Sequence, residues 1–210
     1  GETGAIQQRG AFSQYTGSIF PFLASGKTDT QRGELPWGAR GLFDFTPIDK
    51  DYGLAWSEPG KLAMVKRVNG ADIPGGTLLD DLGPYAGAEI IVPLKDPIYR
   101  SGFDKEGKIV DKTYSLPPRI VAADGSAVTI RRGRREGMML LGSPQGEDAL
   151  VRIDYLKSGL QVKNSFASVS MFIVDFALIE TGGHTAALLL LNERANGQGK
   201  AYLQRLQKDD

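Results

Sequence analysis

The sequence predicts a mainly β protein, an antiparallel meander that forms a barrel or a sandwich, with little helix and an irregular arm at its N-terminal side. From residue 88 onward, apolar or β-branched runs recur at intervals of about 10 residues, the spacing of an antiparallel sandwich or barrel. Turn dipeptides separate most of these runs, including Asp124-Gly125, Gly182-Gly183 and Asn196-Gly197, because Gly and Asn accept a positive φ at low cost. Nine of the eighteen aromatic residues lie among closely spaced glycines in the first 56 residues, which predicts the irregular arm.

Residues 1–60 are predicted to form this arm. Disordered tails are poor in aromatic residues, and each aromatic ring buries a large area, so these rings are expected to pack against something. The cover is either the chain's own barrel or a partner protein. The predicted partner-binding residues are Phe12, Tyr15, Phe20, Phe22, Trp37 and Trp56. Short strand-like pieces at 18–23 and 42–46 are limited by nearby prolines.

Residues 61–210 are predicted to form the antiparallel β domain. The segment 61–68 alternates as a strand does, and the segment 69–87 is rich in turn residues, with one helical turn at 77–82 that Thr77 would cap. Further strands are predicted at 89–94, 108–114, 119–122, 127–132, 138–142, 149–156, 169–179, 185–192 and 201–206.

Two of these segments have features that an ordinary strand does not explain. The segment 185–195 contains strong helix formers, but Gly182-Gly183 links it to the preceding strand as a tight hairpin, so a strand is preferred over a helix. The run 169–179 is apolar on both faces, which predicts a strand covered on both sides. Asp175 inside this run requires a partner, and an arginine from a neighbouring strand is preferred over a cation from another subunit.

Composition excludes several classes of function. Lys plus Arg equals Asp plus Glu, at 25 each, so no global charge attracts nucleic acid or an anionic membrane. No cysteine is present, which removes disulfides and thiolate metal sites. No run approaches the roughly 20 apolar residues of a transmembrane helix. The compartment stays open, and an exported or organellar-lumen protein is preferred because such spaces favour cysteine-free chains.

The sharpest local feature is the charge cluster formed by Arg131, Arg132, Arg134 and Arg135. Guanidinium groups bind phosphate, sulfate and carboxylate groups, so this segment is the predicted site for an anionic ligand or an acidic partner. On a strand, Arg131 and Arg132 point to opposite faces, so only some of the four converge. A solvated hairpin tip, whose arginines pair with Glu136 and other nearby acids, is preferred over such a site.

No catalytic, cofactor-binding or metal-binding residue is predicted. His184 is the only histidine and lies beside a predicted tight turn, where a polar residue is expected in any case. The segment 25–28 resembles the end of a phosphate-binding loop but lacks the required upstream glycine. The acidic pairs, including Glu147/Asp148, fall in predicted turns, where carboxylates serve solubility and capping.

Three functions follow as hypotheses. The preferred one is a non-enzymatic structural or binding subunit of a larger protein assembly, which docks through its aromatic arm and its β surface. The second is a barrel that carries a hydrophobic small molecule, lined by Met138, Leu140, Ile153, Phe172, Val174 and Phe176. The third is an enzyme that does not use histidine, for which no positive signal exists.

Overall fold

A computed structural model describes residues 4–6, 19–21, 44–58, 61–69, 71–88, 90–93, 102–103, 109–110, 113–116, 118–123, 125–135, 144–156, 159–181, 184–195 and 199–207. The fold is mainly β, as predicted, and it contains three antiparallel sheets of three or four strands whose order follows the chain. Each of these sheets is an open meander, so the described residues form no closed barrel, and this alternative of the prediction is wrong. In the described part of the chain, no helix is long and apolar enough to cross a membrane.

The first sheet holds β3 (Phe45–Pro47), β4 (Tyr52–Glu58), β5 (Lys61–Val68) and β6 (Ala71–Thr77), paired in that order. The hairpin β4–β5 joins the predicted arm directly to the β domain. The predicted helical turn exists as a 3-10 helix, Asp80–Leu82, but Leu79 precedes it and Thr77 ends β6 instead of capping it.

The second sheet holds β11 (Ile120–Ala123), β12 (Ser126–Arg131), β13 (Ala149–Leu156) and β14 (Gly159–Asn164). The third holds β15 (Phe172–Thr181), β16 (His184–Asn192) and β17 (Ala201–Gln207). The predicted strand at 185–192 is therefore confirmed over helix. Strand β15 pairs with β16 up to Thr181 opposite His184, as the Gly182-Gly183 dipeptide indicated.

Three short two-stranded pairings complete the strands: β1 (Gly4–Ile6) with β2 (Ile19–Pro21), β7 (Ile90–Pro93) with β10 (Thr113–Leu116), and β8 (Gly102–Phe103) with β9 (Ile109–Val110). Two isolated bridges lie among the described residues outside these strands, between Arg135 and Gln145 and between Asp148 and Val169. The predicted strand at 138–142 lies outside the described residues.

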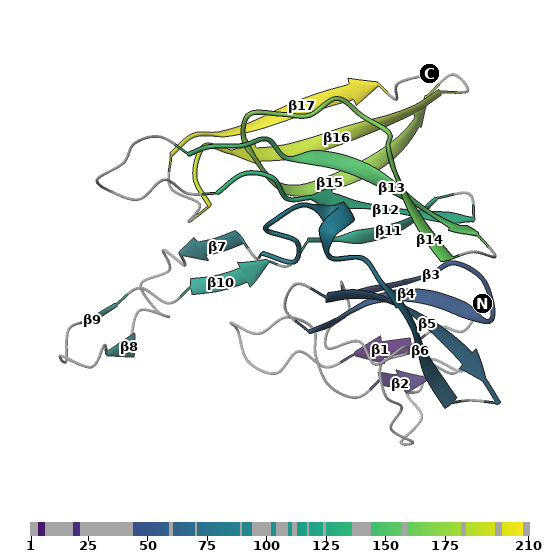
Figure 1. The fold of residues 1–210 in the computed structure, drawn as a ribbon. Coiled ribbons are helices and arrows are strands. Elements are labelled where there is room, and N and C mark those ends of the chain that lie inside the picture. Colours follow the sequence, from purple (N-terminus) through teal and green to yellow (C-terminus); the bar gives the residue numbers. More distant parts are fainter. Residues whose placement is uncertain are drawn as a thin grey trace.

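The β11–β14 sheet is the middle layer of the molecule, between the β3–β6 and β15–β17 sheets (Figure 1). One of its faces supplies Val128, Ile130 and Leu150 to a core shared with β15 and β16. The other face supplies Ala127, Val151 and Ile153 to a core shared with Leu54, Trp56 and Leu62 of the β3–β6 sheet. This sheet is therefore covered on both faces, which is unusual for an antiparallel sheet.

The prediction placed the doubly covered strand elsewhere, at 169–179. In β15, Phe172 and Ile173 are buried, but Ala177 and Ile179 are exposed. A bulge between Ile173 and Asp175 shifts the pairing with β16 and changes which side chains face the core. Asp175 pairs with Arg119 at 3.0 Å, Nε to Oδ1. The partner is an arginine of this chain, as predicted, but it lies just before β11 in another sheet and not on a strand that neighbours β15.

Candidate functional site

The arginine cluster lies along one arm of the β12–β13 hairpin, before its tip. Arg131 is the last paired residue of β12, opposite Ala149, and the ladder resumes where Arg135 bridges Gln145. The backbone N–H of Arg135 donates to the Gln145 carbonyl at 2.9 Å, and the Gln145 N–H donates back at 3.2 Å. Both pairs have the same register, so Arg132 stands opposite Asp148 in the interval between them.

Two glycines allow the hairpin arms to approach closely in this interval. A Cβ on Gly133 would lie 2.3 Å from the Glu147 carbonyl oxygen, and one on Gly146 would lie 1.9 Å from the Gly133 carbonyl oxygen. Gly146 also has a φ of 90°, which side-chain-bearing residues rarely adopt. Glycine is therefore required here by space and, at Gly146, by backbone conformation.

Arg132 and Asp148 form a buried ion pair, with 1% and 0% of their surfaces exposed. Asp148 Oδ2 accepts hydrogen bonds from Arg132 Nη1 and, at 3.0 Å, from the backbone N–H of Ile173. Its Oδ1 accepts from the backbone N–H groups of Gly133, at 3.2 Å, and Arg134, at 3.1 Å. One carboxylate thus connects the hairpin to the start of β15.

The same pair fixes the position of the Arg132 guanidinium. Its Nη1 also donates to the Ile173 carbonyl at 3.0 Å, so this nitrogen contacts both Asp148 and β15. Burial lowers the pKa of Arg132, and the negative charge of Asp148 and its hydrogen bond oppose that shift. The guanidinium keeps its charge at neutral pH, because arginine is not deprotonated in proteins.

The other edge of this guanidinium has no hydrogen-bond partner in the part of the chain that the structure describes. Nε and Nη2 are buried, and among the described residues neither finds a hydrogen-bond acceptor. These two nitrogens lie on one side of the planar group, and their N–H bonds point in parallel. This is the edge that holds a carboxylate or phosphate through two hydrogen bonds.

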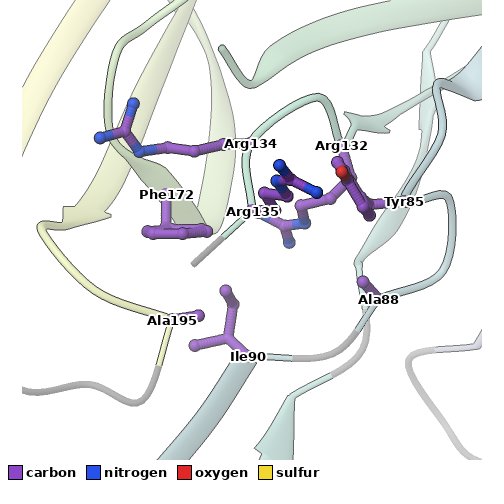
Figure 2. A pocket seen from close by; sticks show the side chains of 8 residues that line it. All are labelled: Tyr85, Ala88, Ile90, Arg132, Arg134, Arg135, Phe172 and Ala195. Atoms are coloured by element: carbon purple, nitrogen blue, oxygen red, sulfur yellow. The ribbon is translucent and has the colours of Figure 1, made fainter. Parts of the chain in front are cut away.

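A pocket of about 190 Å³ adjoins this guanidinium, and its lining includes Tyr85, Ala88, Ile90, Arg132, Arg134, Arg135, Phe172 and Ala195 (Figure 2). The Arg134 guanidinium lies over the Phe172 ring, 5.4 Å from its centroid, and its Nη1 donates to the Gly146 carbonyl at 2.9 Å. Arg135 is exposed. The pocket therefore combines three cationic side chains with an otherwise largely apolar wall.

The fourth arginine lies elsewhere. Arg131 is half-buried, and its Cγ lies 3.5 Å from the position that a Cβ on Gly83 would take. The expected alternation thus separates Arg131 from Arg132, while Arg132, Arg134 and Arg135 converge on one pocket. A solvated hairpin tip does not describe Arg132, which is buried and pairs with Asp148. Glu136, the predicted acid, lies outside the described residues.

The predicted partner-binding residues are mostly outside the described part of the chain: Phe12, Tyr15, Phe22 and Trp37. Phe20 lies in β2, opposite Ala5. Trp56 is buried within this chain, and its Nε1 donates to the Pro118 carbonyl at 3.0 Å. Its ring therefore joins the β3–β6 sheet to the β11–β14 sheet.

The remaining chemical candidates do not assemble into a second site. His184 is exposed at the start of β16. Within the described ranges, no group of three His, Cys, Asp or Glu side chains is placed to hold a metal ion. Ile153 and Phe176, two residues of the predicted carrier lining, belong to separate packed cores on opposite faces of the β11–β14 sheet.

Sequence reasoning missed most of the pocket. The sequence predicts a solvated turn at Asp148, whereas the register of β12 and β13, once extended past Arg131, places it opposite Arg132. The sequence predicts Phe172 in a barrel interior, whereas it lines the pocket. Tyr85, Ala88, Ile90 and Ala195 give no sequence signal, because only the packing of separate elements brings them together.

No protein-family model, no curated protein and no solved structure matches this chain.

Substitution of Asp148 tests the buried pair. Asp148→Asn leaves the Arg132 charge buried without a counter-charge and turns an acceptor oxygen into a donor, so we expect it to lower the free energy of unfolding by about 3–5 kcal/mol. The matched control is Asp175→Asn, which breaks a pair whose side chains are 36% and 38% exposed and should cost at most about 1 kcal/mol. Urea denaturation measures both, and equal losses would contradict the central role of Asp148.

Substitution of Gly146 tests the close approach of the hairpin arms. Gly146→Ala places a Cβ against the Gly133 backbone and forces a strained φ, so we expect it to lower the free energy of unfolding by about 1–3 kcal/mol. Gly76→Ala is the control, because a Cβ there meets nothing within 4 Å. Thermal unfolding measured by circular dichroism compares them, and a Gly146→Ala protein as stable as Gly76→Ala would refute the argument.

Proposed function

We propose that this chain is a non-enzymatic binding subunit of a larger protein assembly, and that its arginine pocket receives an anionic group of the partner or ligand. One observation supports the pocket above all others: a buried, charged Arg132 presents an edge with two unpaired donors beside Arg134 and Arg135. Buried polar groups are almost always hydrogen-bonded, so an anion that accepts from this edge gains interactions that the described residues do not supply.

The chemistry of the pocket supports binding more than catalysis. Asp148, the carboxylate nearest to Arg132, already accepts four hydrogen bonds and is fully buried, so it is not available as a general base. Arginines hold their charge and orient anions instead of exchanging protons. Among the described lining residues, Tyr85 is the only other titratable side chain.

The assembly part of the proposal is supported by the outer face of the β15–β17 sheet. Leu190 and Leu203 are direct cross-strand partners on this face and are 37% and 71% exposed. Leu189 and Leu191, which flank Leu190 in β16, belong to the hydrophobic core. Leu190 and its partner Leu203 therefore lie on the opposite side of the sheet. We propose docking through this surface and through the aromatic N-terminal arm.

Anion binding is tested by thermal stability in a carboxylate salt, acetate or benzoate, against chloride at constant ionic strength. An anion that binds the folded pocket at a hundred times its Kd should stabilise it by about 2.7 kcal/mol, which raises the Tm by several degrees. We expect a smaller rise in Arg135→Gln and an unchanged rise in the control Arg205→Gln, an exposed arginine of β17. General salt effects act on all three proteins alike. Identical rises in all three would refute the pocket.

Docking through the outer face is tested with Leu203→Asp. Chemical crosslinking in extracts of the native source should trap a defined complex with the wild-type chain and much less of it with this variant, because a carboxylate disfavours burial in an interface. Leu156→Asp, at a 42% exposed residue of β13, is the control. A complex of equal yield with Leu203→Asp would show that this face is not the docking surface.

A further inference from the structure

We infer that the arginine pocket recognises a carboxylate attached to a compact apolar group, and that it disfavours inorganic oxyanions. This inference rests on the proposed anion-binding role and adds the chemical class of the ligand. Its two parts come from separate features of the pocket, the free edge of Arg132 and the apolar wall opposite the charges.

The free edge of Arg132 specifies a two-oxygen acceptor. Asp148 and the Ile173 carbonyl occupy Nη1, which fixes the guanidinium and leaves Nε and Nη2 as the remaining donors. The two N–H bonds are parallel and lie in one rigid plane. Their spacing matches two oxygen atoms that are bonded to the same carbon, phosphorus or sulfur, as in a carboxylate, phosphate or sulfate. A halide ion provides only one acceptor atom, so it uses this geometry poorly.

The wall of the pocket separates the carboxylate from the tetrahedral anions. Ala88, Ile90, Phe172 and Ala195 supply no side-chain hydrogen bond. Phosphate and sulfate have oxygens in all directions, so some of them would face these side chains and lose hydration without compensation. A carboxylate carries both oxygens at one end, so its apolar body is free to contact Ile90 and Phe172.

The charges and the volume limit the ligand further. Among the described residues of the site, three arginines and the carboxylate of Asp148 give a formal charge of +2, which favours an anion over a neutral amide of the same shape. The volume of about 190 Å³ is below the roughly 300–1,000 Å³ of pockets for drug-sized ligands. The apolar body is therefore about the size of one ring or a short branched chain.

Access to the free edge of Arg132 requires a movement of the pocket wall. Nε and Nη2 are buried, so a ligand reaches them only when part of the wall moves. Arg135 is exposed, and exposed side chains change rotamer within nanoseconds. Arg135 is thus suited both to open the path and to contact the bound carboxylate from its outer side.

The test is binding to the full chain, measured by isothermal titration calorimetry and by the NMR signal of the Arg132 Nε–H group. The probes are benzoate, its neutral isostere benzamide, acetate and inorganic phosphate. We expect benzoate to bind at least about tenfold more tightly than each of the other three, and to shift the Arg132 Nε–H resonance, because a charge-assisted contact or a buried apolar body is worth about 1.5–3 kcal/mol.

Three variants separate the contributions. Arg132→Lys keeps the charge but removes the two-donor edge, and Arg135→Gln removes an exposed charge; each should weaken benzoate binding by about tenfold. Ala88→Phe fills the pocket from an exposed position and should abolish binding without affecting folding. If Arg132→Lys fails to fold, the other two variants and the resonance shift still decide the question.

The outcomes distinguish this inference from the proposed function. If phosphate or acetate binds in the pocket as tightly as benzoate, the apolar specificity is refuted while the anion site stands. If no anion binds, or if Ala88→Phe binds benzoate normally, both the carboxylate specificity and the proposed anion-binding role are refuted. A peptide with a C-terminal leucine carboxylate, compared with its amidated form, then identifies the source of the carboxylate: tighter binding than benzoate indicates a protein chain end, and weaker binding indicates a free small acid.

Discussion

The buried pair of Arg132 and Asp148 is the contact on which the central part of the structure depends. Removal of two charges from water is costly, and the cost is offset only when geometry and additional hydrogen bonds are good. Asp148 meets this requirement with four donors from two segments: the Arg132 side chain with the backbone of the two residues that follow it, and the start of β15. Because the backbone of Asp148 also pairs with Val169, this one residue fixes the approach of the third sheet to the second.

The layered packing explains why a charge is buried at this point. The β11–β14 sheet has cores on both faces, and its β12–β13 hairpin extends beyond the ladder toward β15. Alternation places Arg132 on the face of Ile130 and Leu150, which the β15–β17 sheet covers. A long cationic side chain on that face needs a counter-charge inside the protein, and Asp148 lies directly opposite in the register.

The pocket forms because elements that are distant in sequence end at the same place. Phe172 begins β15, Ile90 begins β7, Ala195 follows β16, and the arginines follow β12. Irregular backbone at the ends of strands leaves space that regular packing would fill. The glycines at 133 and 146 allow the two hairpin arms to approach closely there. Arg134 lies over the Phe172 ring, and Arg132 donates a hydrogen bond to Asp148.

The amino-acid sequence by itself determined the fold class and the β15–β16 hairpin, and it indicated that Asp175 needs a cationic partner, because hydrophobic periodicity, glycine turns and an isolated charge are local signals. Strands β6 and β14 escaped prediction, since Pro74 and two glycines in β6 and the polar residues of β14 suit exposed edges and not cores. Only the tertiary structure decided that the sheets stack as open layers, that the second sheet is the one covered on both faces, and that three of four arginines share a pocket. These outcomes depend on register and on contacts between distant segments, which no local pattern encodes.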